Sequence, residues 1–175
     1  LSIPSGVGVA LLMNNQLYKG GKGYAGEFGH TTIELGGRPC PWGNRGCLEQ
    51  YLSEEVLLKE YAEQKQLGEI NLSTLFQAYH NNDTDAEKII RKFLKYTAVG
   101  IHNIQRFADP EIIILNSRIT AALPETREQL LDLLPGGAGG RCPVLYSSLG
   151  DRAALLGGTV LCMKEFAGID ILFHA

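Results

Sequence analysis

Two carboxylates, an imidazole and two thiols are the side chains in this sequence whose types and spacing could support chemistry. All five fall within the first third of the chain: Glu27, His30, Cys40, Cys47 and Glu49. Taken singly, each is more typical of a structural role, such as a core histidine, a small buried thiol or a solvated charge. Together, the imidazole and thiols favour a soft-metal site that is one ligand short of a closed tetrahedral zinc centre.

Short strands and a loop must position these residues. Two asparagines between apolar segments predict a hairpin, with strands over 6–13 and 16–19 and a turn at Asn14-Asn15. Residues 30–34 are a further strand candidate. Residues 36–47 hold four glycines, two prolines and two cysteines, so this loop needs something to organise it.

The rest of the chain alternates helices and strands. A helix is expected after Ser53, its N-cap, and a long helix with an apolar stripe of period 3.6 is expected from a Thr84/Glu87 capping box to Asp109-Pro110. The remaining expected elements are a fully buried strand at 111–115, a helix at 124–134, a strand at 143–146 and a helix at 151–166 whose central glycines allow close packing. This order predicts a mixed α/β layer fold.

The composition excludes several classes of protein. A length of 175 residues with 45% hydrophobic and 20% charged residues fits one folded domain and is not that of a disordered chain. No apolar run is long enough for a membrane span, and a net charge of −3 without a basic stripe makes nucleic-acid binding by this chain unexpected. Four cysteines and no signal peptide favour a reducing cytoplasm.

The segments Glu27-Phe-Gly-His30 and Cys40-Pro-Trp-Gly-Asn-Arg-Gly-Cys47-Leu-Glu49 resemble the signature of the ROK family of repressors, open reading frames and sugar kinases. The resemblance extends over nearly the whole chain. It implies an α/β fold that is the C-terminal lobe of the actin/hexokinase-like (ribonuclease H-like) fold, a mixed sheet covered by helices. Residues 1–175 would be a single domain, and a fragment that lacks the N-terminal lobe and any DNA-binding domain.

The same resemblance implies roles for the candidate residues. Glu27, His30 and Glu49 would bind sugar hydroxyls, and no residue of this lobe would be catalytic. The zinc ligands would be His30, Cys40, Cys47 and the residue at position 42, which here is Trp42.

Tryptophan cannot ligate zinc, because its indole nitrogen is only a donor. Three outcomes are therefore open: zinc held by three protein ligands and a water, a substitute ligand such as Cys142, or no zinc. Trp42 could bury its ring where the thiolate would sit.

Two departures from the family pattern bear on ATP. Pro4 precedes Ser-Gly-Val-Gly8 where a phosphate loop would lie, and it removes one backbone N–H. Asn116-Ser117-Arg118 stands where enzymes of the family carry glycines beside the adenosine. ATP binding is therefore unexpected. The resemblance is closest to the repressor branch; an ATP-dependent, glucokinase-like sugar kinase is the alternative, and a structural oligomerisation module is a third.

The expected function is thus that of a sugar-binding and oligomerisation domain of a transcriptional regulator. Its expected partners are a small-molecule sugar or sugar phosphate and further copies of the chain in a homodimer or higher homo-oligomer, with the apolar segment 169–173 as candidate interface. DNA would be reached only through a missing N-terminal domain, and no membrane is involved.

Overall fold

The computed structural model describes residues 1–136 and 142–168, so the proposed interface segment 169–173 lies outside the described residues. The predicted hairpin is confirmed, although its strands are shorter than expected. Strands β1 (Leu12–Met13) and β2 (Gln16–Leu17) pair antiparallel. Asn14 and Asn15 have φ values of 52° and 59°. Both are left-handed, as a two-residue turn between twisted strands requires.

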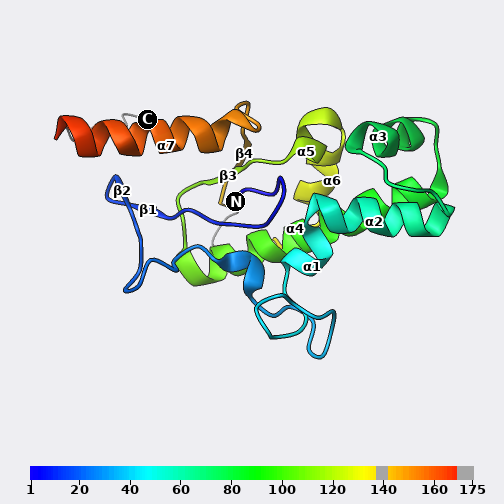
Figure 1. Cartoon of the computed structure of the whole chain (residues 1–175), viewed down its shortest axis with the longest axis horizontal. Coiled ribbons are helices and arrows are strands. Elements are labelled where there is room, and N and C mark those ends of the chain that lie inside the picture. The colour runs from blue at the N-terminus through cyan, green and yellow to red at the C-terminus, as the bar shows by residue number, and fades with distance from the viewer. Residues whose placement is uncertain (137–141, 169–175) are drawn as a thin grey trace.

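The core is built around the long helix α4 (Thr84–Ala108), against which α1 (Glu49–Leu52), α2 (Glu54–Lys65) and α3 (Leu72–His80) pack (Figure 1). The stripe predicted on α4 is confirmed, since its buried side chains include Ile89, Phe93, Ile101 and Ile104. The register of this stripe fixes which face of α4 the helices α1, α2 and α3 pack against.

Several local predictions are wrong. The N-cap of α4 is Asp83, whose carboxylate accepts hydrogen bonds from the backbone N–H groups of Asp85 and Ala86, so the Thr84 capping box does not form. Ser53 is the N-cap of α2, as predicted, although its side chain makes no capping hydrogen bond. Residues 30–34 form no strand: a short 3-10 helix η1 (Phe28–His30) is followed by a single bridge between Thr32 and Cys47.

Strand β3 (Ile113–Leu115) pairs parallel with β4 (Val144–Tyr146). On the other side of β3, the first residues of the chain lie alongside it: the backbone N–H of Ile3 donates to the carbonyl of Asn116, the residue after β3, at 2.8 Å. The expected full burial of this strand is wrong, since Ile114 is 55% exposed between two buried neighbours. Helices α5 (Arg118–Ala122) and α6 (Thr126–Asp132) connect β3 to β4. The mixed α/β class is confirmed, with two small two-stranded sheets within the described residues.

Helix α7 (Arg152–Ala167) extends to one side of the core (Figure 1). None of its described side chains is buried, and a Cβ placed on Gly157 or Gly158 would meet no atom within 4 Å. The close packing expected of these glycines is therefore not made within the described part of the chain. No described helix combines the length and hydropathy needed to cross a bilayer.

Candidate functional site

The segment that carries Glu27 and His30 is hydrogen-bonded to residues 7–9, which precede the hairpin. Val9 donates its backbone N–H to the Gly26 carbonyl at 2.9 Å, and Gly29 donates to the Val7 carbonyl at 3.1 Å. A Cβ on Gly29 would overlap that Val7 carbonyl oxygen, so only glycine permits this close approach. The packing fixes the start of η1 and with it the place of the His30 ring.

The three candidate metal ligands lie together. The ligand atoms of His30, Cys40 and Cys47 are all within 4.8 Å of one another, and both cysteines are buried. The distance from Cys40 Sγ to His30 Nδ1 is 3.6 Å. Bond lengths of zinc to sulfur and nitrogen give an edge of about 3.6 Å between such ligands in a tetrahedron. The imidazole and one thiol are thus already spaced as zinc requires.

The surroundings of Cys47 favour a neutral thiol when no cation is bound. Burial, followed by a hydrogen bond to Cys40 and the charge of Cys40, raises the pKa of the Cys47 thiol to about 11. Its Sγ lies 2.9 Å from Asn44 Oδ1, which fits a thiol that donates to an amide oxygen. A soft divalent cation would offset the cost of deprotonating Cys47, because it stabilises the thiolate.

Trp42 lies beside this cluster and not within it. Gly43 donates to the Cys40 carbonyl at 2.9 Å, which closes a tight turn with Pro41 and Trp42 at its corners. The indole is 59% exposed and stacks on the His30 ring, with centroids 4.7 Å apart and an interplanar angle of 22°. The expectation that Trp42 buries its ring in place of a thiolate is therefore wrong.

The donor set fits a zinc ion held by three protein ligands. One imidazole and two thiols are the donors zinc prefers, and a fourth position can hold a water. Among the described residues no further His, Cys, Asp or Glu joins the three, and Cys142, which hydrogen-bonds to the Pro143 carbonyl, is not a substitute ligand. His30, Cys40 and Cys47 would hold the ion, which would fix the imidazole through Nδ1 and leave Nε2 for a ligand.

Gly46 permits the backbone conformation that places Cys47 in the cluster. Its φ is +78°, and a Cβ there would overlap the Glu34 carbonyl oxygen. Gly43, in the same loop, has φ +90° but no atom within 4 Å of a built Cβ. A side chain at either position would be strained by the left-handed backbone, but only one at Gly46 would also overlap a neighbouring main-chain atom.

We expect Gly46→Ala to lower the free energy of unfolding by about 3 kcal/mol or more, because strain and overlap with main chain add. Gly43→Ala should cost only about 1 kcal/mol, the left-handed penalty alone. Urea unfolding of both variants measures the difference. Equal losses would show that the backbone at Gly46 relaxes freely.

Both candidate carboxylates offer oxygens to a ligand. Glu27 is half-exposed, and its Oε2 lies 3.7 Å from His30 Nε2. Glu49 begins α1, and its Oε2 accepts the Val7 N–H at 2.9 Å. Its other oxygen, Oε1, has no hydrogen-bond partner among the described residues. Glu49 therefore holds the backbone at Val7 with one oxygen, and its second oxygen remains available.

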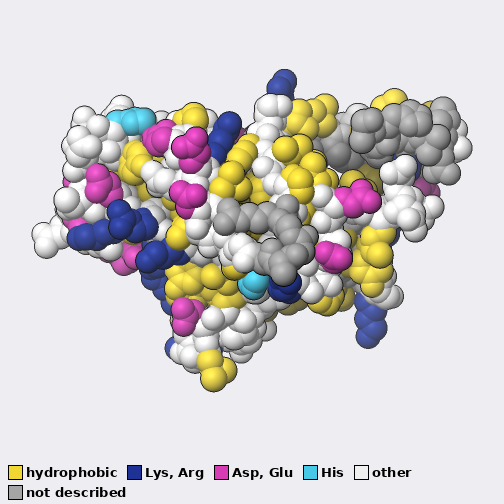
Figure 2. All heavy atoms as spheres, turned by 180° about the vertical axis from the view of Figure 1, so that it is seen from behind, with side chains coloured by type: hydrophobic (Ala, Val, Ile, Leu, Met, Phe, Trp, Pro, Cys, Tyr) yellow, Lys and Arg dark blue, Asp and Glu magenta, His cyan; other side chains and the backbone are white. Residues whose placement is uncertain are grey.

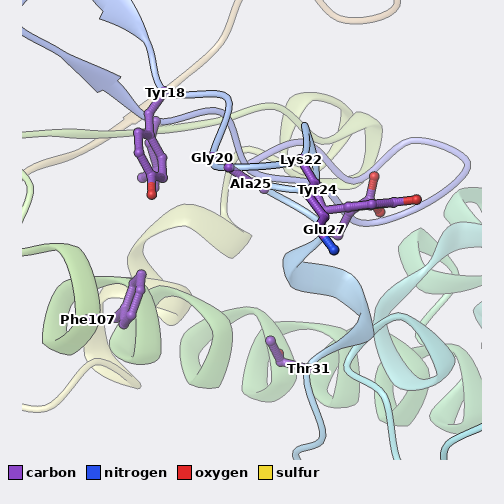
Figure 3. Close-up of a pocket in the computed structure, with 11 residues that line it drawn as sticks. Tyr18, Gly20, Lys22, Tyr24, Ala25, Glu27, Thr31 and Phe107 are labelled. Atoms are coloured by element: carbon purple, nitrogen blue, oxygen red, sulfur yellow. The ribbon is translucent and has the colours of Figure 1, made fainter.

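An open pocket of about 330 Å³ adjoins Glu27. Figure 3 shows Glu27 and Tyr24 extending in the same direction from the segment that follows the hairpin. His30 and Glu49 do not line this pocket, whose other walls include Leu11, Tyr18, Lys22, Thr31 and Phe107. Sequence reasoning missed Tyr24, for which the only signal was a lone aromatic residue within a glycine-rich connector.

At the carboxyl end of β3, the side chains of Asn116 and Arg118 contact other elements of the fold. Asn116 Nδ2 donates to the Gly150 carbonyl at 3.1 Å. Arg118 Nε donates to Glu54 Oε2 at 2.8 Å, and Arg118 also lies near Asp151 at the start of α7. Glu54 is 2% exposed, and burial raises the pKa of its carboxyl against the opposing effect of Arg118. These residues connect β3, α2 and the start of α7.

Known proteins share this fold. A ROK family glucokinase from Streptomyces griseus, solved in complex with glucose and AMPPNP, superposes with a TM-score of 0.79 at 24% identity over 91% of this chain and 58% of its own. The fold is thus the actin/hexokinase-like one. Residues 1–165 match the ROK family, and the chain belongs to that family.

Curated relatives include both regulators and enzymes. The xylose repressor of Bacillus spizizenii is 33% identical over 172 residues, which are 96% of this chain and 44% of the relative. The N-acetyl-D-glucosamine kinase of Pasteurella multocida is 30% identical over 132 residues, 69% of this chain and 43% of the kinase. The chain thus spans less than half the length of these relatives.

Proposed function

We propose that this chain is the sugar-binding and oligomerisation part of a ROK transcriptional regulator, and that it has no catalytic residue of its own. The observation that carries the proposal is a contrast between two regions. A carboxylate oxygen of Glu27 lies beside His30, and one of Glu49 has no hydrogen-bond partner among the described residues, whereas the side chains of Asn116 and Arg118 are engaged with other parts of the fold.

The first region suits a sugar or sugar phosphate. Carboxylates accept hydrogen bonds from hydroxyls, and an imidazole fixed at Nδ1 offers Nε2 as one defined contact. Hydrogen bonds to charged groups contribute about 1.5–3 kcal/mol each. Because the Bacillus relative is a xylose repressor, D-xylose is the first sugar to test, with D-glucose and N-acetyl-D-glucosamine after it.

The second region supports the absence of ATP binding. Asn116 also donates to Ser2 Oγ at 3.3 Å, so its amide links the chain start to Gly150. Arg118 is held by Glu54, whose burial makes that ion pair costly to break. A nucleoside would have to displace both side chains from these contacts.

The remaining proposals concern the whole protein. A net charge of −3, and basic side chains that form separate groups on the face seen in Figure 2, support a chain that does not itself bind DNA. We propose that DNA contact lies in another part of the regulator, that the protein works in the cytoplasm, and that copies of this lobe associate.

The second candidate function is the C-terminal lobe of an ATP-dependent sugar kinase. It is favoured by the identity with the Pasteurella multocida kinase and by the glucokinase superposition. Under that alternative Asn116 and Arg118 would release their partners when nucleotide binds.

Calorimetric titration with Mg-ATP, with and without D-xylose, separates the two. We expect no saturable heat from nucleotide and no ADP production. A dissociation constant tighter than about 100 μM, or about −5.5 kcal/mol, would favour the kinase.

A further inference from the structure

Two aromatic rings stand in contact on the surface beside the candidate sugar site. Trp42 and Tyr24 are 59% and 64% exposed, and their rings meet edge to face with centroids 6.3 Å apart. Trp42 comes from the loop over residues 36–47 and Tyr24 from the segment after the hairpin. Neither ring is needed to fill the core, since most of each faces solvent.

Each ring of the pair adjoins a residue of the candidate sugar site, Trp42 at His30 and Tyr24 at Glu27. Tyr24 and Glu27 line the same pocket, and Glu27 Oε2 is 3.7 Å from His30 Nε2. The metal ligand Cys40 instead approaches the opposite ring nitrogen, Nδ1. A ligand bound at Nε2 and Glu27 would therefore meet the aromatic pair and not the thiols.

The stack of Trp42 on His30 leaves part of the indole uncovered. Rings in contact lie about 3.5 Å apart, so a centroid distance of 4.7 Å corresponds to a sideways displacement of about 3 Å. The indole is also the larger ring. It thus extends past the imidazole edge as a flat apolar surface.

We propose that Trp42 and Tyr24 form an aromatic platform, in which the face of Trp42 packs against the C–H face of a sugar ring held by Glu27 and His30 and the perpendicular Tyr24 ring borders it. The inference rests on the sugar-binding function proposed above and adds the residues that read the apolar side of the ligand. Burying C–H groups on an aromatic ring removes apolar surface from water. The ligand class is a pyranose with equatorial hydroxyls, whose C–H groups point to the ring faces.

The platform would make sugar binding more specific. The hydroxyls of the sugar would be read by carboxylates that many sugars satisfy, while the platform accepts only a ring with an uninterrupted apolar face. Trp42 then replaces a metal ligand of the family pattern by a contact to the effector.

The test uses the fact that Trp42 is the only tryptophan of the 175 residues. The chain is titrated with D-xylose, and then with D-glucose and N-acetyl-D-glucosamine, and each titration is followed in parallel by calorimetry and by tryptophan emission. We expect a saturable blue shift with the calorimetric dissociation constant. Trp42→Leu should bind about tenfold more weakly, which is about 1.4 kcal/mol, whereas Trp42→Phe should remain within threefold of the parent chain.

Phe166→Leu is the matched control, since it removes an aromatic ring that is 96% exposed on α7, and its affinity should not change. Circular dichroism and urea unfolding establish that each variant is folded. If Trp42→Leu binds D-xylose as the parent does, without any change in the parent's emission on binding, the platform is wrong while sugar binding stands. If no sugar gives heat with the parent chain, sugar binding itself fails, and the platform with it.

Discussion

Replacing Trp42 by cysteine is expected to raise the zinc content of the protein toward one ion per chain. The parent chain presents three donors, with Cys40 Sγ and His30 Nδ1 already spaced as in a tetrahedral centre. A third thiolate would add both a soft ligand and a negative charge. We expect an increase in zinc affinity on the order of 100-fold, measured by metal analysis after purification without chelator and by competition with a chromophoric chelator.

Trp42→Ser is the control for this change, because it removes the indole without supplying a thiolate. It should leave zinc affinity within a few-fold of the parent value. Stoichiometric, chelator-resistant zinc in the parent chain would show that Trp42 does not weaken the site. A gain in Trp42→Ser equal to that in Trp42→Cys would show that the indole, and not a missing ligand, limits binding.

Removing the Glu49 carboxylate is expected to have the largest effect on sugar affinity. Glu49→Ala takes away an acceptor for a hydroxyl and the acceptor of the Val7 N–H. We expect sugar binding to weaken by roughly 30- to 100-fold and the free energy of unfolding to fall by about 1 kcal/mol. Glu49→Gln keeps an acceptor for Val7, so it should be as stable as the parent and lose about tenfold in affinity, since a neutral acceptor replaces a charged one.

Glu55→Gln is the matched control for charge, because Glu55 is an exposed glutamate in the first turn of α2. Its sugar affinity should equal that of the parent. Calorimetry with D-xylose gives the affinities, and urea unfolding gives the stabilities. Unchanged affinity in Glu49→Gln would remove this residue from the site.

The elements that sequence predicted well are those with local causes. The Asn14-Asn15 turn forms because asparagine tolerates positive φ. The apolar stripe of α4 places Phe93 and Ile101 in the core because the period of a helix dictates which side chains share a face. Neither conclusion needed long-range information.

The errors arise where tertiary contacts decide. Residues 31–33 are all β-branched, yet they form no strand: η1 ends at His30, and only Thr32 forms a bridge, to Cys47. Asp83 outcompetes Thr84 as N-cap and also pairs with Lys65 at 2.7 Å, a contact that the local sequence does not reveal. Ile114 is exposed because only one face of β3 meets the core.

The candidate site shows the same division. The spacing of histidine and cysteines predicted a shared centre, and their ligand atoms do lie within 4.8 Å of one another. The stack of Trp42 on His30 and its contact with Tyr24 could not be predicted, because a tight turn in one loop sets the ring against a residue from another segment.

The most direct test of the central claim is an amide ¹H–¹⁵N spectrum of the chain titrated first with D-xylose and then with Mg-ATP. Sugar should shift the resonances of residues 26–30 and 47–49. It should also shift that of Val7, whose N–H donates a hydrogen bond to Glu49. ATP should leave residues 116–118 and 150–151 unmoved. Shifts at 116–118 and 150–151 with Mg-ATP, or no shifts at 26–30 with any sugar, would contradict the account of a sugar-binding regulator lobe.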